Sequence, residues 1–170
     1  MDLPVDNIRA ALENFRGVDR RFQLRGKIAG VSVIDDYGHH PTEIAAVLAA
    51  ARASLGRRLV VAFQPHRYTR TQRLMGAFGP ALREADEIVL TDIYAASEDA
   101  IPGVTIEALA EAVRSGSGRP VRVAKSLDDV IPAILDIARP GDAVITLGAG
   151  SIGSLPSRLI EALGQRGGGR

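Results

Sequence analysis

The chain has 170 residues, of which 46% are hydrophobic and 24% are charged, and its formal net charge is +1. This length and composition fit one ordinary folded domain and exclude an intrinsically disordered chain. The balanced charge argues against nucleic acid or a membrane surface as a partner, and the lack of Cys excludes disulfides and thiol nucleophiles. No apolar run is long enough to span a membrane, and the N-terminus has no signal-peptide pattern, so we expect a cytoplasmic protein.

The first part of the chain predicts a short helix followed by a β-hairpin. In residues 6–15 the apolar side chains recur at helical spacing, and Asp6 is placed to cap the helix. Two strands, at 20–25 and 28–35, are expected to join around Gly26.

After the hairpin, helices and strands alternate. We expect strands at 59–63, 87–91, 121–124 and 143–147, and helices at 41–55, 70–85, 105–114, 127–138 and 151–163. The second of these helices is expected to break around Gly79 and Pro80, because Pro disrupts helix interiors. The alternation predicts an α/β fold: a Rossmann-like, doubly wound, mostly parallel sheet of about six strands with helices on both faces.

The domain boundary is expected close to Gly17. Residues 1–16 lie outside the alternating pattern, so we interpret them as a connector or as the last helix of an upstream domain. Residues 17–170 then form the domain itself, with a frayed tail from Gly164 onward.

Three loops that directly follow predicted strands carry the side chains best suited to binding. They are residues 35–43 (DDYGHHPTE), 64–70 (QPHRYTR) and 148–153 (GAGSIG), and all three His of the chain fall in the first two. Ligands of an open α/β sheet bind at the carboxyl ends of its strands, and loops presented by a rigid sheet often carry function. We therefore expect these loops to form the binding site.

The first loop has the features of a nucleotide or anion site. Pro41 fixes the start of a helix whose N-terminal N–H groups then face the crevice, which favours an anion. Asp36 can accept hydrogen bonds from ribose hydroxyls, and Tyr37 or His39 can stack on a base or bind a small ligand. The alternative is an ordinary turn built from Asp and Gly.

The second loop carries two arginines, Arg67 and Arg70, at the start of a helix. Their spacing places them on neighbouring sides of the helix, so the two guanidinium groups can clamp one carboxylate or phosphate. Arg70 and Arg73 can also be interpreted as solvated helix charges. Arg67 is harder to explain in that way, because it follows a buried strand directly, between His66 and Tyr68.

The third loop matches the pattern Gly-x-Gly-x-x-Gly, but no strand follows that would carry the acidic residue of a dinucleotide site. We therefore reject an NAD site and expect a close backbone approach into a helix that Ser151 caps. The chain also has no Gly-x-x-x-x-Gly-Lys-[Ser/Thr] loop, so the triphosphate of ATP would have to be held elsewhere.

A metal site is a competing interpretation of the same loops. It would use the carboxylates and imidazoles of Asp35, Asp36, His39, His40 and His66. Adjacent histidines usually point in different directions, and no paired-histidine spacing supports these. A metallohydrolase is therefore kept only as an alternative, and no metal ligand is assigned.

Taken together, these motifs resemble a known family. Residues 35–43 and 63–71, with 15–23 upstream and 148–153 downstream, are similar in order and type to the C-terminal domain of the Mur ligases of peptidoglycan synthesis. The first two motifs are long and specific, and they are most similar to those of the ligases that join L-alanine to UDP-N-acetylmuramate. The resemblance runs across nearly the whole chain.

The resemblance implies the third domain of a bacterial, cytoplasmic, ATP-dependent amide ligase. Such a ligase converts the carboxylate of UDP-N-acetylmuramate into an acyl phosphate, which then reacts with L-alanine. ATP and Mg²⁺ are held mainly by a central P-loop domain that this chain lacks, so the chain alone is expected to be inactive. The oligomeric state is left open.

The resemblance also implies roles for individual residues. The nucleotide would be contacted by Arg21 and Asp36, and the alanine pocket would contain Tyr37, His39, Arg67, Arg70 and Ser151, with His40 and His66 as support. Ser151 departs from the family pattern, in which Asp or Asn is more usual. No catalytic residue is assigned within the chain.

Two other functions remain open. One is the corresponding domain of a muropeptide-recycling Mur ligase, although the sequence of residues 66–68 favours the alanine enzyme. The other is a free-standing nucleotide-binding module.

Overall fold

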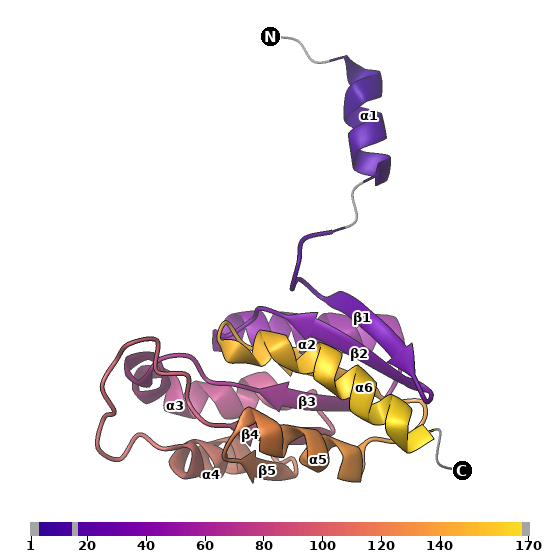
Figure 1. The fold of residues 1–170 in the computed structure, drawn as a ribbon. Helices are drawn as coiled ribbons and strands as arrows, with labels where there is room; N and C mark the ends of the chain where they lie inside the picture. The colour runs from indigo at the N-terminus through magenta and orange to yellow at the C-terminus, as the bar shows by residue number, and fades with distance from the viewer. Residues whose placement is uncertain (1–3, 15–16, 168–170) are drawn as a thin grey trace.

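The computed structural model describes residues 4–14 and 17–167 (Figure 1). Its centre is a six-stranded sheet in the order β1-β2-β6-β3-β4-β5. The strands are β1 (Gln23–Ile28), β2 (Val31–Asp36), β3 (Leu59–Phe63), β4 (Glu87–Thr91), β5 (Val121–Ala124) and β6 (Ala143–Leu147). Strand β1 is antiparallel to β2, and the other neighbours are parallel. The mostly parallel α/β sheet predicted from the sequence is confirmed.

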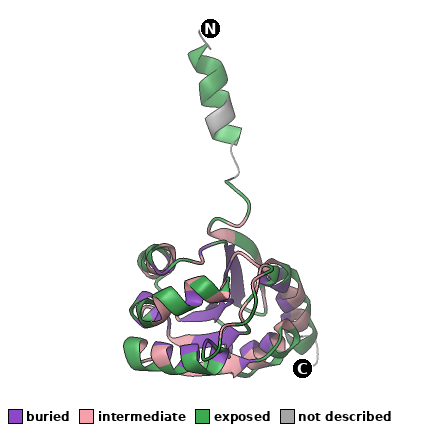
Figure 2. Cartoon of the chain, turned by 90° about the vertical axis from the view of Figure 1, so that its left-hand side faces the viewer, coloured by how far each residue is buried: buried purple, intermediate pink, exposed green. Residues whose placement is uncertain are grey.

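Helices cover both faces of this sheet. They are α2 (Pro41–Leu55), α3 (Tyr68–Leu82), α4 (Ile106–Ser117), α5 (Leu127–Ile137) and α6 (Leu155–Gly167), with a 3₁₀ turn η1 (Ser151–Ser154) before α6. Buried side chains of α2, α3 and α4 form one apolar cluster with the sheet, and those of α5 and α6 form another. The chain builds outward from β2 to β5 and then returns to the centre with β6, so right-handed crossovers place the later helices on the opposite face. Figure 2 shows the buried strands between helices whose outer sides are exposed.

The position of β6 between β2 and β3 brings the carboxyl ends of these three strands together at one end of the sheet. All three strands are buried along their whole length, as expected for parallel strands that are covered on both faces. Their carboxyl ends place the loops that begin at Tyr37, Gln64 and Gly148 side by side. The sequence predicts the binding site at this end of the sheet.

The hairpin turn lies elsewhere than predicted. The chain turns at Ala29 and Gly30, both at positive φ (48° and 79°), whereas Gly26 lies inside β1. A Cβ on Gly26 would stand 2.9 Å from Cδ1 of Ile160 in α6. The strand register is also irregular between Leu24 and Gly26. Gly26 therefore allows α6 to approach β1, and the prediction of a turn around it is wrong.

Helix α3 also differs from the prediction, because it begins at Tyr68 and continues through Pro80 without a break. A contact with α4 explains why a glycine occupies position 79: a Cβ there would stand 2.7 Å from Cα of Gly116 in α4. The two glycines let the backbones of α3 and α4 approach closely. Pro80 lacks the N–H that would donate to the carbonyl of Gly76, so α3 loses one backbone hydrogen bond there, and the helix ends two residues later at Leu82.

Helix α1 (Val5–Asn14) stands apart from the domain in Figures 1 and 2, and its described side chains, including Val5 and Ile8, are exposed. The assignment of residues 1–16 as a connector stays a prediction, and residues 1–3 and 15–16 are outside the described part. At the other end α6 continues to Gly167, so residues 164–167 of the tail for which fraying was predicted are helical, and residues 168–170 are outside the described part.

Substituting the two glycines of α3 tests the close helix contact. We expect Gly79→Ala to destabilise the domain by about 1–3 kcal/mol, because the added methyl group overlaps the backbone of α4. Gly76→Ala is the matched control: that glycine is exposed and a Cβ there would meet open space, so we expect stabilisation of about 0.5–1 kcal/mol. Urea unfolding followed by circular dichroism measures both. Equal unfolding free energies for the two variants would contradict the contact.

Candidate functional site

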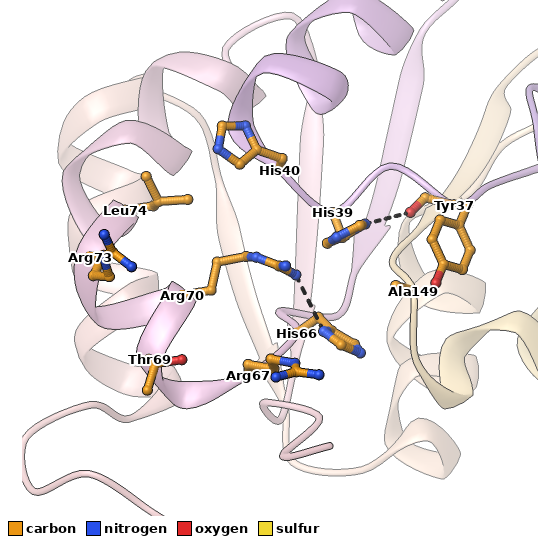
Figure 3. A pocket seen from close by; sticks show the side chains of 10 residues that line it. All are labelled: Tyr37, His39, His40, His66, Arg67, Thr69, Arg70, Arg73, Leu74 and Ala149. Carbon is orange, nitrogen blue, oxygen red and sulfur yellow. Dashed lines mark hydrogen bonds between the residues drawn. The ribbon is translucent and has the colours of Figure 1, made fainter. Parts of the chain in front are cut away.

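The loops after β2, β3 and β6 border an open hollow of about 620 Å³ (Figure 3). Its lining consists of Tyr37, His39, His40, His66, Arg67, Thr69, Arg70, Arg73, Leu74 and Ala149. The structure thus brings together the predicted pocket residues of the first two loops. Ser151 is not among the lining residues, and the third loop contributes Ala149 instead.

The histidine side of the hollow is fixed by the start of α2. The Nδ1 atom of His40 accepts a hydrogen bond from the amide of Thr42 (3.3 Å), and Glu43 accepts from the amides of His39 (3.0 Å) and His40 (3.2 Å). Burial raises the pKa of Glu43, but these backbone amides and the neighbouring His39 and Arg21 more than offset it and lower the pKa overall. His40 is therefore the helix cap, and Pro41 begins the helix as predicted.

Asp36 is turned toward the backbone. Its carboxylate accepts from the amide of Gly38 (2.6 Å) and, through the other oxygen, from the amide of Phe22 (2.7 Å). The residue is only 3% exposed. In this structure Asp36 therefore orders the loop and ties it to the entry segment of the domain.

Tyr37 and Arg21, in contrast, are exposed and adjacent. The guanidinium carbons of Arg20 and Arg21 lie 5.3 and 5.6 Å from the centroid of the Tyr37 ring, which is within cation–π range. The ring of His39 meets Tyr37 edge-on at 5.4 Å. An aromatic surface with a cationic border results, next to the hollow.

The second loop holds Arg67 in a backbone conformation that is unusual for a residue other than glycine, with φ at 73°. Its amide donates to the carbonyl of Tyr94 (2.8 Å), and its carbonyl accepts from the amide (3.1 Å) and the hydroxyl (2.8 Å) of buried Thr71. These contacts compensate for the strained backbone. They direct Arg67 to the mouth of the hollow from the position just before α3.

Arg70 reaches across the hollow toward His66 (Figure 3). Its Nη1 atom lies 3.3 Å from Nδ1 of His66. Because a guanidinium group can only donate, Nδ1 is the acceptor and the ring proton of neutral His66 is on Nε2. Burial lowers the pKa of His66, and the positive charges of Arg70 and Arg67 and the neighbouring His39 lower it further.

The glycine turn does not have the predicted cap. Ser151 begins the 3₁₀ turn rather than capping a helix, and the amide of Ile152 donates instead to Oε1 of Gln64 (2.9 Å). The Nε2 atom of Gln64 donates to the hydroxyl of Ser151 (3.1 Å). A Cβ at Gly150 would stand 2.6 Å from Cγ of Tyr94, so the close backbone approach predicted for this loop is present. Gln64 therefore performs the capping role that was predicted for Ser151.

Two functional neighbours come from the loop after β4, which the sequence motifs did not place at the site. The ring of Tyr94 stacks on His66 with centroids 5.4 Å apart, and Glu98 contacts Thr69 and Arg67. The sequence made Tyr94 a site candidate, because this tyrosine lies at the end of an apparent strand, but no role was assigned to it. For Glu98 there was no such signal, because its contact is made across 29 residues of sequence.

The carboxylates proposed for a metal site are engaged elsewhere. Asp35 is buried, pairs with Arg20 (2.8 Å) and accepts from the hydroxyl of Thr146 (2.7 Å). In residues 4–14 and 17–167, no group of three or more His, Asp and Glu is placed to hold a metal ion. Across the same residues, no helix combines the length and apolar character needed to cross a membrane.

Comparisons with known proteins agree with the resemblance in the sequence. Residues 20–150 match the family model described as "Mur ligase, glutamate ligase domain". Over 163 residues the chain is 53% identical to the UDP-N-acetylmuramate–L-alanine ligase of Koribacter versatilis and 49% identical to that of Myxococcus xanthus. Each alignment covers 96% of this chain, but only 35% and 34% of the two relatives.

Solved structures show the same fold. The UDP-N-acetylmuramate–alanine ligase of Thermotoga maritima superposes with a TM-score of 0.77 at 29% identity, covering 96% of this chain and 34% of that one. A murein peptide ligase of Psychrobacter arcticus gives 0.72, also at 29% identity, covering 91% and 32%. A domain from a related ligase of Haemophilus ducreyi gives 0.62 at 23% identity, which supports the fold alone, and 99% of it is covered.

The chain thus spans about a third of the length of the curated relatives it matches. Its sheet order, its loop motifs and its match over residues 20–150 are all consistent with one domain type. The chain belongs to the Mur ligase family, in which it is a C-terminal, glutamate ligase domain similar to that of the UDP-N-acetylmuramate–L-alanine ligases.

Proposed function

We propose that this domain binds L-alanine in an ATP-dependent ligase that joins it to UDP-N-acetylmuramate. The observation that carries the proposal is the hollow in which Arg67 and Arg70 stand together with His39 and His66 at the carboxyl ends of β2 and β3. The relatives of about 50% identity, which are named for that reaction, support the choice of substrate.

In this proposal the two arginines anchor the carboxylate of alanine. Arg67 and Arg70 are one turn apart, and both line the hollow. Charge-assisted hydrogen bonds from guanidinium groups to a carboxylate are among the strongest polar contacts in proteins. Since the Nε2 atom of His66 carries the ring proton, this histidine is a further donor and not a base. Anchoring the carboxylate leaves the amino group of alanine free to face its reaction partner.

The chemistry that we propose is amide formation through an acyl phosphate. The amine nitrogen attacks the acyl carbon, the new C–N bond forms, and the C–O bond to phosphate breaks with loss of inorganic phosphate and a proton. The contribution of this domain is to position the amine, because a fixed geometry removes much of the entropic barrier. No residue of this chain is assigned as the general base.

For the nucleotide we propose contacts with Arg21, with the exposed ring of Tyr37 and with lone pairs of Asp36 that its two backbone amides leave free. The chain has no P-loop sequence, and its described residues include no cluster that fits Mg²⁺. The triphosphate and the metal ion therefore do not fit this chain alone. We assign them to another part of the ligase, which also makes the isolated domain inactive.

One alternative has structural support. The murein peptide ligase of Psychrobacter arcticus has the same sequence identity to this chain, 29%, as the alanine ligase of Thermotoga maritima. A domain of that kind would bind a peptide in place of L-alanine. Titration with both ligands distinguishes the two functions.

Arg67→Ala tests the carboxylate anchor. We expect millimolar L-alanine to shift amide NMR signals of the 170-residue chain around Arg67 and Arg70, and the variant to bind about 10- to 100-fold more weakly, as for the loss of a charged hydrogen bond. Arg122→Ala, at an exposed position in the edge strand β5, is the control and is expected to bind like the unaltered chain. An unaltered affinity in Arg67→Ala would refute the anchor.

Nucleotide binding separates the ligase from a free-standing module. Calorimetric titration of the 170-residue chain with Mg²⁺–ATP is expected to show no binding at micromolar concentrations, since the chain lacks a phosphate cradle. The gene upstream of the Met1 codon should encode, in frame, a Gly-x-x-x-x-Gly-Lys-[Ser/Thr] loop. Tight ATP binding by the chain alone would favour the module instead.

The state of His66 has a measurable pH dependence. Its pKa is lowered, so NMR titration should give a midpoint below the usual value of about 6.5. Between these two pH values the unfolded chain binds a proton that the folded chain does not, so lowering the pH through this window destabilises the domain. Arg70→Ala should raise the midpoint part of the way, because burial remains. A midpoint at or above the usual value would contradict the partly buried, neutral ring.

A further inference from the structure

We propose that Glu98, in the loop between β4 and α4, is a positioning residue for Arg67 and thereby favours a zwitterionic amino acid over simple anions. The identity of the ligand rests on the proposed function, whereas the contact between Glu98 and Arg67 does not. Neither the sequence motifs nor the family resemblance assigns Glu98 to the site.

The loop is attached to the site by its backbone. The amide of Tyr94 donates to the carbonyl of Pro65 (2.8 Å), and the carbonyl of Tyr94 accepts from the amide of Arg67 (2.8 Å). His66 and Tyr94 form a parallel bridge, and their rings stack. The residues after β4 therefore extend the sheet alongside the second loop.

Glu98 then completes the start of α3. Its Oε2 atom accepts from the amide of Thr69 (3.0 Å) and its Oε1 atom from the hydroxyl of Thr69 (2.7 Å). The helix has no side-chain cap of its own, so this carboxylate satisfies part of its N-terminus from another loop. The same Oε1 lies 3.7 Å from Nη1 of Arg67. The two bonds from Thr69 lower the pKa of Glu98, which keeps it charged at neutral pH.

The backbone before Glu98 supports a functional placement. Ala96 and Ser97 have positive φ (49° and 68°), and the amide of Glu98 donates to the carbonyl of Ala95 (3.0 Å). Two consecutive left-handed residues other than glycine are unfavourable and persist only where surrounding contacts compensate for them. Arg67 is itself left-handed. Both members of the pair therefore project from backbone that is held in one conformation.

The charge of Glu98 has a consequence for ligand choice. Three arginines line the hollow, namely Arg67, Arg70 and Arg73, so without a nearby carboxylate it would attract any small anion. Glu98 offsets part of this charge and orients Arg67, whose side chain is 49% exposed. The negative charge of Glu98 lowers the affinity for phosphate more than the affinity for a ligand that carries an ammonium group as well as a carboxylate. The amino acid is thus favoured over phosphate.

Glu98→Gln tests this assignment in the 170-residue chain, with Glu111→Gln on the exposed face of α4 as the control for loss of one acidic charge. The first measurement is ¹⁵N relaxation of the Arg67 Nε–H group without ligand. We expect the order parameter of this group to fall to that of the exposed Arg122 in Glu98→Gln and to stay unchanged in the control. Unchanged order of Arg67 in Glu98→Gln would overturn the proposal, whether or not alanine binds.

The second measurement compares affinities for L-alanine and inorganic phosphate by NMR titration. We expect the ratio to fall about threefold or more in Glu98→Gln, as for loss of one partly exposed ion pair. If Glu98 had a purely structural role, its loss would lower the affinities for both ligands equally. The ratio of affinities would then stay unchanged, and this result would refute the selectivity. Thr69→Val, which keeps the charge but removes one anchor of Glu98, should lower the order of Arg67 partially. Failure of the unaltered chain to bind L-alanine counts against the proposed function, while the order of Arg67 still decides the positioning role.

Discussion

The site depends on the insertion of β6 between β2 and β3. Hydrogen bonds continue past the strand ends: the amide of Gln64 donates to Leu147 (3.0 Å), and that of Gly148 donates to Asp36 (3.2 Å). The first residues of the second and third site loops are therefore hydrogen-bonded to the adjacent strand. Because these strands are packed against helices on both faces, a change of register would disrupt the packing of both apolar clusters, so the relative position of the three loops is set by the core.

An ion pair between partly exposed Arg20 and buried Asp35 connects these strands to the segment that enters the domain. Arg20 pairs with Asp35, donates through Nη2 to the carbonyl of Gly148 (2.6 Å), and accepts from the amide of Tyr37 at its own carbonyl (2.8 Å). Removing charges from water is costly, and this pair is retained with additional hydrogen bonds on both partners. The segment that leads toward the N-terminus is thus fixed to the first and third site loops. Any domain that precedes it would be attached next to the hollow.

The sequence predicted those features that arise from local patterns. Apolar periodicity placed the elements after the hairpin, and Pro41 marked the start of α2 correctly, whereas the first strand begins three residues later than predicted. The errors have a common cause, which is contact between distant residues. Gly26 was expected to form a turn, but it lies in β1, where the lack of a side chain leaves room for Ile160 of α6. The cap predicted for Ser151 comes from Gln64, and the interruption predicted at Pro80 is absent from α3, whose Gly79 meets α4.

The site could be predicted only in part, for the same reason. Arg67, Arg70 and the histidines follow buried strands, so the α/β pattern was enough to place them at one edge. The strand order that makes them neighbours is a tertiary property, and no pattern near residue 98 indicated that its carboxylate would reach Thr69.

The distribution of charge in the hollow indicates what the domain does and does not supply. Guanidinium groups and a neutral imidazole offer donors, which hold a carboxylate but do not remove a proton from an amine. Glu43 and Glu98, which contact residues that line the hollow, accept hydrogen bonds from backbone amides, and their pKa values are lowered, so neither is suited to act as a base near neutral pH. In the function that we propose, such a site selects and positions a substrate, and the groups that activate the acyl partner come from another part of the ligase. This division fits a chain that spans about a third of the length of its relatives.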